Sequence, residues 1–139
     1  MNLGMFYLEC SLVFNNTILR PSILYASETL YNLTEVEIRQ IERLEESYWR
    51  QILKTSRSCP LAEIYLSVGQ KPARFEIVKR RMLFLKNILD QDETSITKQF
   101  FYVQHQNKTK GDLVSTMMKD LIYLDVNLSF QQIREMKTN

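Results

Sequence analysis

The stretch TEVEIRQIERLEESYWRQILKT (residues 34–55) carries the strongest structural signal in the chain. Thr34 and Glu37 have the S/T-x-x-E spacing of a capping box, in which each side chain bonds the other residue's backbone N–H at a helix start. Beyond the box, apolar residues recur every three or four positions and form one stripe: Ile38, Ile41, Leu44, Tyr48 and Ile52. We therefore predict a helix over residues 35–55, with Tyr48 and Trp49 in the core.

The rest of the chain is also expected to be helical, because its 139 residues include only three Gly and three Pro. Further helices are predicted over residues 4–19, 21–32, 60–68, 72–90, 95–106 and 112–124. A second capping-box spacing, Ser129 and Gln132, starts a last helix that the chain end cuts short. The prediction is an all-α bundle of about seven to eight helices, without significant sheet, forming a single domain over residues 1–139.

Composition is that of an ordinary soluble globular protein, with 45% hydrophobic residues, 24% charged residues and a net charge of +2. Two cysteines without a CxxC pattern favour free thiols in an intracellular compartment, nuclear or cytoplasmic. No signal peptide is recognisable, and the longest uncharged stretch, residues 10–19, is too short to cross a membrane. His105 has no ligand-type partner at helical spacing, so we expect no metal site and no cofactor.

Positive charge concentrates in residues 71–90, which contain six basic and two acidic side chains. The candidates for nucleic-acid contact in this segment are Arg74, Lys79, Arg80, Arg81 and Lys86. On a helical wheel these side chains form no single stripe, because they flank both sides of the apolar seam. Two interpretations stay open: an ordinary solvated helix surface, and a surface that contacts phosphate groups.

Two carboxylates are expected to face the core. Glu45 falls inside the apolar stripe of the helix over residues 35–55, and Glu28 shares a helix face with Leu24 and Tyr31. Such a pair could act as general acid and base, but a buried carboxylate more often accepts hydrogen bonds that keep it paired. The sequence has no G-x-S-x-G elbow, no Gly-rich phosphate loop and no Asp-Asp pair. We predict no catalytic residues, no enzymatic activity and no small-molecule substrate.

Five short segments follow one another along the chain: ILYASETL at 23–30, RQIL at 50–53, EIYLSVGQKPARFEIVKRRMLFLKNIL at 63–89, KGDL at 110–113 and DL at 120–121. In order and spacing they resemble the region after the polymerase palm in reverse transcriptases of non-LTR (LINE-type) retrotransposons. The resemblance is to elements whose polymerase is followed by a zinc knuckle and a restriction-like endonuclease. Ala26 and Leu30 stand where that family often has Gly and Trp, and the catalytic motifs of palm, knuckle and endonuclease have no counterpart here.

The resemblance implies a helical thumb over residues 1–90 and a smaller connecting portion over residues 91–139. In such polymerases the thumb holds the template–primer duplex by its backbone, so the expected partners are RNA or RNA/DNA duplex and the remainder of the polymerase chain. Lys79, Arg80 and Arg81 match the family's basic motif and are expected to contact the nucleic acid. Ser27 and Glu28 match its Ser-Glu motif.

We interpret Ser27 and Glu28, together with Glu45, as a structural element made of packing and hydrogen bonds. An alternative function is a helical protein-interaction module that does not bind nucleic acid. It would use exposed apolar surface in the FFY segment at residues 100–102. In the helix over residues 95–106, Ile96, Phe100 and Val103 are expected to face inward.

Overall fold

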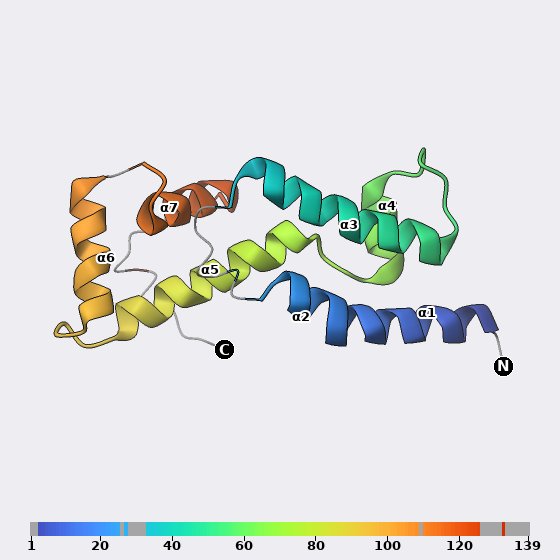
Figure 1. The fold of residues 1–139 in the computed structure, drawn as a ribbon, viewed down its shortest axis with the longest axis horizontal. Helices are drawn as coiled ribbons and strands as arrows, with labels where there is room; N and C mark the ends of the chain where they lie inside the picture. Colours follow the sequence, from blue (N-terminus) through green and yellow to red (C-terminus); the bar gives the residue numbers. More distant parts are fainter. Residues whose placement is uncertain (1–2, 26, 28–32, 109, 126–131, 133–139) are drawn as a thin grey trace. The chain divides into compact units, whose positions relative to one another are not determined.

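A computed structural model describes residues 3–25, 27, 33–108, 110–125 and 132. These residues form helices joined by short connections, and they contain no β-strand, which confirms the all-α class. In chain order (Figure 1) the elements are α1 (Leu3–Phe14), the π-helical turn η1 (Asn15–Leu19), α2 (Arg20–Ile23), α3 (Glu35–Leu53), α4 (Leu61–Val68), α5 (Ala73–Asp90), α6 (Ile96–Asn107) and α7 (Leu113–Tyr123). Because α1, η1 and α2 are continuous, the described residues contain six separate helices, where seven to eight were predicted.

The backbone packs into two compact units. Unit 1 comprises the described residues of Met1–Tyr25 and Leu33–Ile77, and unit 2 those of Ala26–Asn32 and Val78–Asn139. The division falls within α5, after its first turn. The sequence predicted a single domain with thumb-like helices over residues 1–90 and a smaller connecting portion over residues 91–139.

The N-terminal helix continues through Pro21, where two separate helices were predicted. Proline in an α-helix clashes with the carbonyl four residues earlier and lacks the N–H of the helical ladder. Here the wider turn η1 precedes the proline, and the Arg20 N–H bonds the Asn15 carbonyl five residues back. This extra residue per turn accommodates the ring without ending the helix. The helix ends at Ile23 and not near Asn32 as predicted; residues 26 and 28–32 lie outside the described residues.

The predicted capping box of α3 is confirmed. The Thr34 hydroxyl accepts the Glu37 backbone N–H, and the Glu37 carboxylate accepts the Thr34 N–H at 2.7 Å. The inward face is rotated slightly from the predicted stripe, since Leu44 is 65% exposed while Ile38, Glu45 and Trp49 are buried. The prediction that Leu44 faces inward is therefore wrong, whereas the prediction that Glu45 faces the core is confirmed.

Unit 1 has its core around Trp49, which is fully buried against Ile64, Tyr65 and Val68 of α4. Leu8 and Leu12 of α1 pack against the same cluster. In Figure 1 the chain runs in opposite directions along α1 and α3, and α4 lies beside the C-terminal part of α3. As predicted, α4 ends just before Gly69, whose φ of +64° is the left-handed conformation that favours glycine. Pro60, predicted in the first turn, is the residue that precedes the helix.

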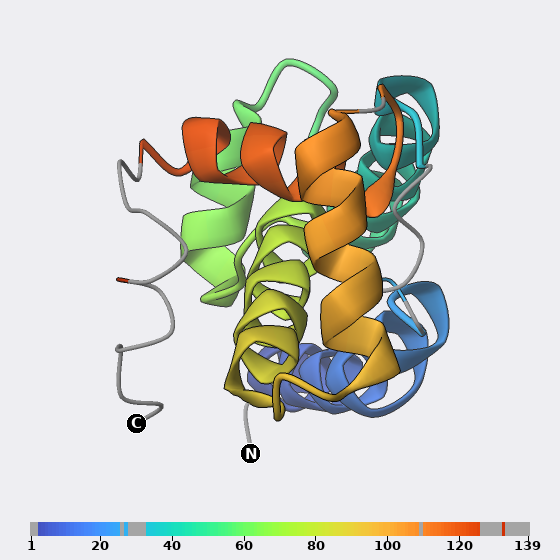
Figure 2. The same ribbon diagram turned by 90° about the vertical axis from the view of Figure 1, so that its left-hand side faces the viewer.

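Unit 2 has its core where α5, α6 and α7 meet, and Figure 2 shows α7 running transverse to α6. The fully buried members include Leu85, Phe101 and Met117. As predicted, α7 is capped by Asp112, whose carboxylate accepts the Ser115 N–H at 2.7 Å. Ser129 of the predicted last helix lies outside the described residues, and Gln132 is exposed.

The predicted inward face of α6 is wrong. Ile96, Phe100 and Val103 are 84%, 60% and 51% exposed, and the buried positions are Lys98 and Phe101. Lys98 can be buried because its Nζ donates to the Gln91 carbonyl at 2.8 Å and to the Glu93 carboxylate at 2.7 Å, while its alkyl stem packs inside. These two acceptors in the preceding connection set the rotation of the helix.

Candidate nucleic-acid interface

Arg74 and Lys86, two of the basic candidates in α5, contact carboxylates. Arg74 forms a two-pronged pair with Glu35, at 2.8 and 3.1 Å, and a longer contact of 3.5 Å with Glu42. The hydrogen bonds that Arg74 donates to the Glu35 carboxylate raise the pKa of Arg74 above its ordinary value. Lys86 donates to Asp90 one turn further along the helix, at 2.8 Å. These contacts are those of structural ion pairs.

Arg81 lies within the core of unit 2, which removes it from the candidate surface. Its guanidinium is only 2% exposed and contacts both carboxylate oxygens of Asp120 in α7, at 3.2 and 3.3 Å. A buried guanidinium needs such a partner, because burial of an isolated charge is very costly. In this conformation Arg81 cannot reach a phosphate group, so it is corrected to a structural role that joins α5 to α7.

Two further candidates, Lys79 and Arg80, are adjacent on α5. Lys79 is exposed, and Arg80 lines a shallow pocket of about 250 Å³ together with Leu83, Phe84 and Asn87. A cation beside an aromatic ring and an amide can contact a phosphate and the flat face of a base. We call Lys79, Arg80 and this pocket the α5 surface.

Glu45 is the centre of a polar network in unit 1. Its carboxylate accepts the Arg20 Nε–H at 2.7 Å and the Tyr65 hydroxyl at 3.1 Å, so it joins α2, α3 and α4. A further bond runs from the Arg20 guanidinium to the Lys71 carbonyl. Burial and the negative charge of Glu45 raise the pKa of Tyr65 well above its ordinary value of 10. The donors from Arg20 and Tyr65 keep the buried Glu45 carboxylate hydrogen-bonded, as expected for a carboxylate with a structural role.

The Ser-Glu motif is only partly described. Ser27 is 2% exposed, consistent with a packed position, and Glu28 lies outside the described residues. The prediction that Glu28 and Glu45 face one core therefore stays a prediction. Within the described residues, no group of three or more His, Cys, Asp or Glu side chains is arranged to hold a metal ion.

A second basic surface lies on the outer side of α3, and the sequence analysis missed it. Arg43, Ser47, Gln51, Thr55 and Arg57 line a groove of about 690 Å³ in unit 1, with Glu46 and Arg50 as the remaining lining residues. We call it the α3 groove. Its signal was present in the sequence: the same helical wheel that gives the apolar stripe places basic residues of α3 together on the opposite side.

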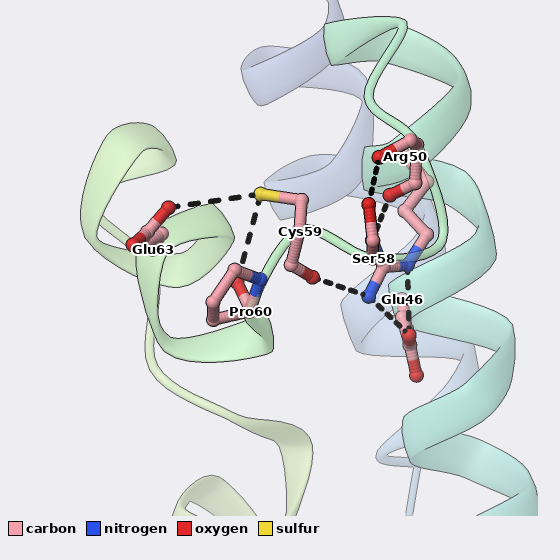
Figure 3. Close-up of polar contacts among 7 residues, drawn as sticks. Glu46, Arg50, Ser58, Cys59, Pro60 and Glu63 are labelled. Atoms are coloured by element: carbon pink, nitrogen blue, oxygen red, sulfur yellow. Dashed lines mark hydrogen bonds and ion pairs between the residues drawn. The ribbon is translucent and has the colours of Figure 1, made fainter.

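Arg50 fixes one wall of the α3 groove. Its guanidinium donates to Glu46 at 2.8 Å and to the backbone carbonyls of Ser56 and Cys59 at 2.6 and 3.0 Å. Figure 3 shows this side chain reaching from α3 to the loop that leads into α4. The loop begins at Lys54, whose φ of 51° is left-handed and ends α3. Arg50 thereby holds the segment that carries Thr55 and Arg57.

No family model, curated protein or solved structure matches this chain. No helix formed by the described residues is both long and apolar enough to cross a lipid bilayer.

Proposed function

We propose that this chain is a non-catalytic, thumb-like module that holds nucleic acid by its sugar–phosphate backbone, as the resemblance to retrotransposon reverse transcriptases implies. The observation that supports the proposal is the α5 surface. Lys79 is exposed there, and the half-buried Arg80 lines a pocket beside Phe84 and Asn87. Template–primer RNA/DNA hybrid is the ligand that this function requires.

Fluorescence anisotropy with a labelled RNA/DNA hybrid duplex tests the proposal, titrated between about 50 and 200 mM salt. The variant Lys79→Ala/Arg80→Ala should weaken binding roughly tenfold and reduce the salt slope by about 2, because each phosphate contact contributes about 0.9 to that slope. The matched control is Lys108→Ala/Lys119→Ala, which removes the same charge from exposed positions elsewhere in unit 2. An equal loss in both variants, or no binding by the unmodified chain, would refute the α5 surface.

A second candidate function is protein interaction, and the outer face of α6 favours it. Ile96, Phe100 and Val103 are spaced three and four residues apart and are all more than half exposed. An apolar stripe of this kind is typical of a helix that packs against another protein surface. The remainder of a polymerase chain is one such partner. A chain that ignores duplex at low salt, yet loses self-association or partner binding on Phe100→Ser, would support this alternative.

A further inference from the structure

The α3 groove combines a fixed frame with exposed cationic groups. Arg50 is bound internally, by one carboxylate and two backbone carbonyls, and so acts as a brace for the loop. Arg43 and Arg57 are exposed, and neither guanidinium forms an ion pair with another described residue. The lining holds three arginines against the single carboxylate of Glu46, so its net charge is +2. Such a surface attracts an anion.

Neutral donors complete the groove. Ser47 and Gln51 lie one helical turn apart on α3 and present a hydroxyl and an amide to it. The Thr55 hydroxyl oxygen is buried and has no hydrogen-bond partner among the described residues, although Thr55 lines the groove. Guanidinium groups together with hydroxyl and amide donors are the set that recognises phosphate oxygens.

The surrounding helix surface indicates a polymeric anion. Arg39, Arg43 and Arg50 fall within an arc of about 40° on α3, at 3.6 residues per turn, and Lys54 follows at the end of the helix. From residue 39 to residue 50 the helix rises by about 17 Å, which corresponds to about five steps of one nucleic-acid strand. A free phosphate ion would occupy one point of this surface, whereas a polynucleotide backbone would contact several of its exposed cationic side chains.

We propose that the α3 groove is a second nucleic-acid contact in unit 1, in which Arg43 and Arg57 bind phosphodiester groups and Thr55 donates to a phosphate oxygen. The inference rests on the proposed function for the kind of ligand, but it uses residues outside the basic motif that led to the α5 surface. Arg50 is a positioning residue, since it acts through the loop and does not contact the ligand.

The test measures binding of a labelled RNA/DNA hybrid, and of single-stranded RNA of the same sequence, to the full chain. Arg43→Ala/Arg57→Ala should weaken binding to either probe about tenfold and lower the salt slope by about 2, while Lys108→Ala/Lys119→Ala leaves both unchanged. Thr55→Val keeps the shape of the side chain and should weaken binding about threefold without altering the salt slope. Fluorescence of Trp49, which is buried in the same unit, verifies that each variant is folded.

The outcomes separate this inference from the proposed function. Loss of affinity in Arg43→Ala/Arg57→Ala, with none in Lys79→Ala/Arg80→Ala, would keep the α3 groove and reject the α5 surface. The reverse pattern would reject the groove alone, and a folded chain that binds neither probe rejects both. Equal competition by inorganic phosphate at matched ionic strength, or tighter binding to phosphatidylserine vesicles than to either probe, would also overturn a polynucleotide ligand.

Discussion

Replacing Glu45 with alanine tests how the polar network of unit 1 stabilises its helices. Glu45 is 4% exposed and accepts bonds from Arg20 and Tyr65, which belong to two other helices. Removing the carboxylate leaves the Tyr65 hydroxyl without this acceptor in a buried position and takes away the counter-charge of Arg20. We therefore expect a large loss of stability in unit 1.

The magnitude follows from these contacts. A hydrogen bond to a charged group contributes about 1.5–3 kcal/mol, and a buried hydroxyl left without its acceptor costs about 1–3 kcal/mol. Arg20 keeps its bond to the Lys71 carbonyl and is 13% exposed, so part of its charge is still solvated. The expected destabilisation by Glu45→Ala is then about 3–4 kcal/mol, at the lower end of the range for broken buried ion pairs.

Urea unfolding followed by tryptophan fluorescence measures this loss directly. The chain has one tryptophan, Trp49, which is fully buried in unit 1 and lies edge-on to the Tyr48 ring, with centroids 4.9 Å apart. With a slope of about 1.5 kcal/mol per molar urea, a loss of 3 kcal/mol lowers the unfolding midpoint by about 2 M. Glu9→Ala, at an exposed position of α1, is the matched control and should not move it.

A double-mutant cycle decides whether the effect comes from the network. Tyr65→Phe should cost much less in the Glu45→Ala background than in the unmodified chain, with a coupling of about 1–2 kcal/mol. Additive effects, or an unchanged midpoint for Glu45→Ala, would refute the reasoning, since either result means that the carboxylate does not hold the phenol and the guanidinium together.

Three further predictions concern the other titratable contacts. Asp120→Ala deprives the buried Arg81 guanidinium of that carboxylate and should destabilise unit 2 by about 3–5 kcal/mol, measured by circular dichroism in urea; a loss below 1 kcal/mol would contradict a buried pair. Because burial and Glu45 raise the pKa of Tyr65, its stabilising contribution is complete below pH 10 and is lost as pH rises further. In an ultraviolet titration its ionisation should coincide with unfolding, and Tyr65→Phe should remove that late step. Hydrogen bonds in the capping box lower the pKa of Glu37, so its contribution is present above pH 4.5 and is lost as pH falls below that value; Glu37→Gln should flatten this acid limb of the stability curve.

Local sequence signals predicted the elements whose determinants are short in sequence. Thr34 and Glu37 lie three residues apart and located the start of α3, and Asp112 did the same for α7. Pro60 and Gly69 bounded α4 because a proline and a left-handed glycine act on the backbone next to them. The buried carboxylate at Glu45 was also visible from helical periodicity alone.

Contacts between distant residues explain what the sequence did not reveal. Arg81 can be buried because it pairs with Asp120, which is 39 residues away in the sequence. Its neighbours Lys79 and Arg80 form a basic run with it, and this run predicted an exposed arginine. The rotation of α6 is set by Lys98 and its acceptors, while apolar side chains occur on several sides of that helix. The α3 groove is an intermediate case. Arg43 and Arg50 lie on the polar side of α3, which helical periodicity shows, but Arg57 belongs to the following loop, whose position depends on the bonds from Arg50 to the Ser56 and Cys59 carbonyls.

The π-helical turn before Pro21 has a consequence for natural variation in length. A π turn is equivalent to one residue added to a regular helix, and each residue turns a helix by about 100°. Deleting one residue within Asn15–Leu19 would restore a regular α-helix, in which the Pro21 ring would meet the carbonyl four residues earlier. Such a deletion should be tolerated only alongside replacement of Pro21, so a length change and a proline change at this point are expected to occur together among related chains.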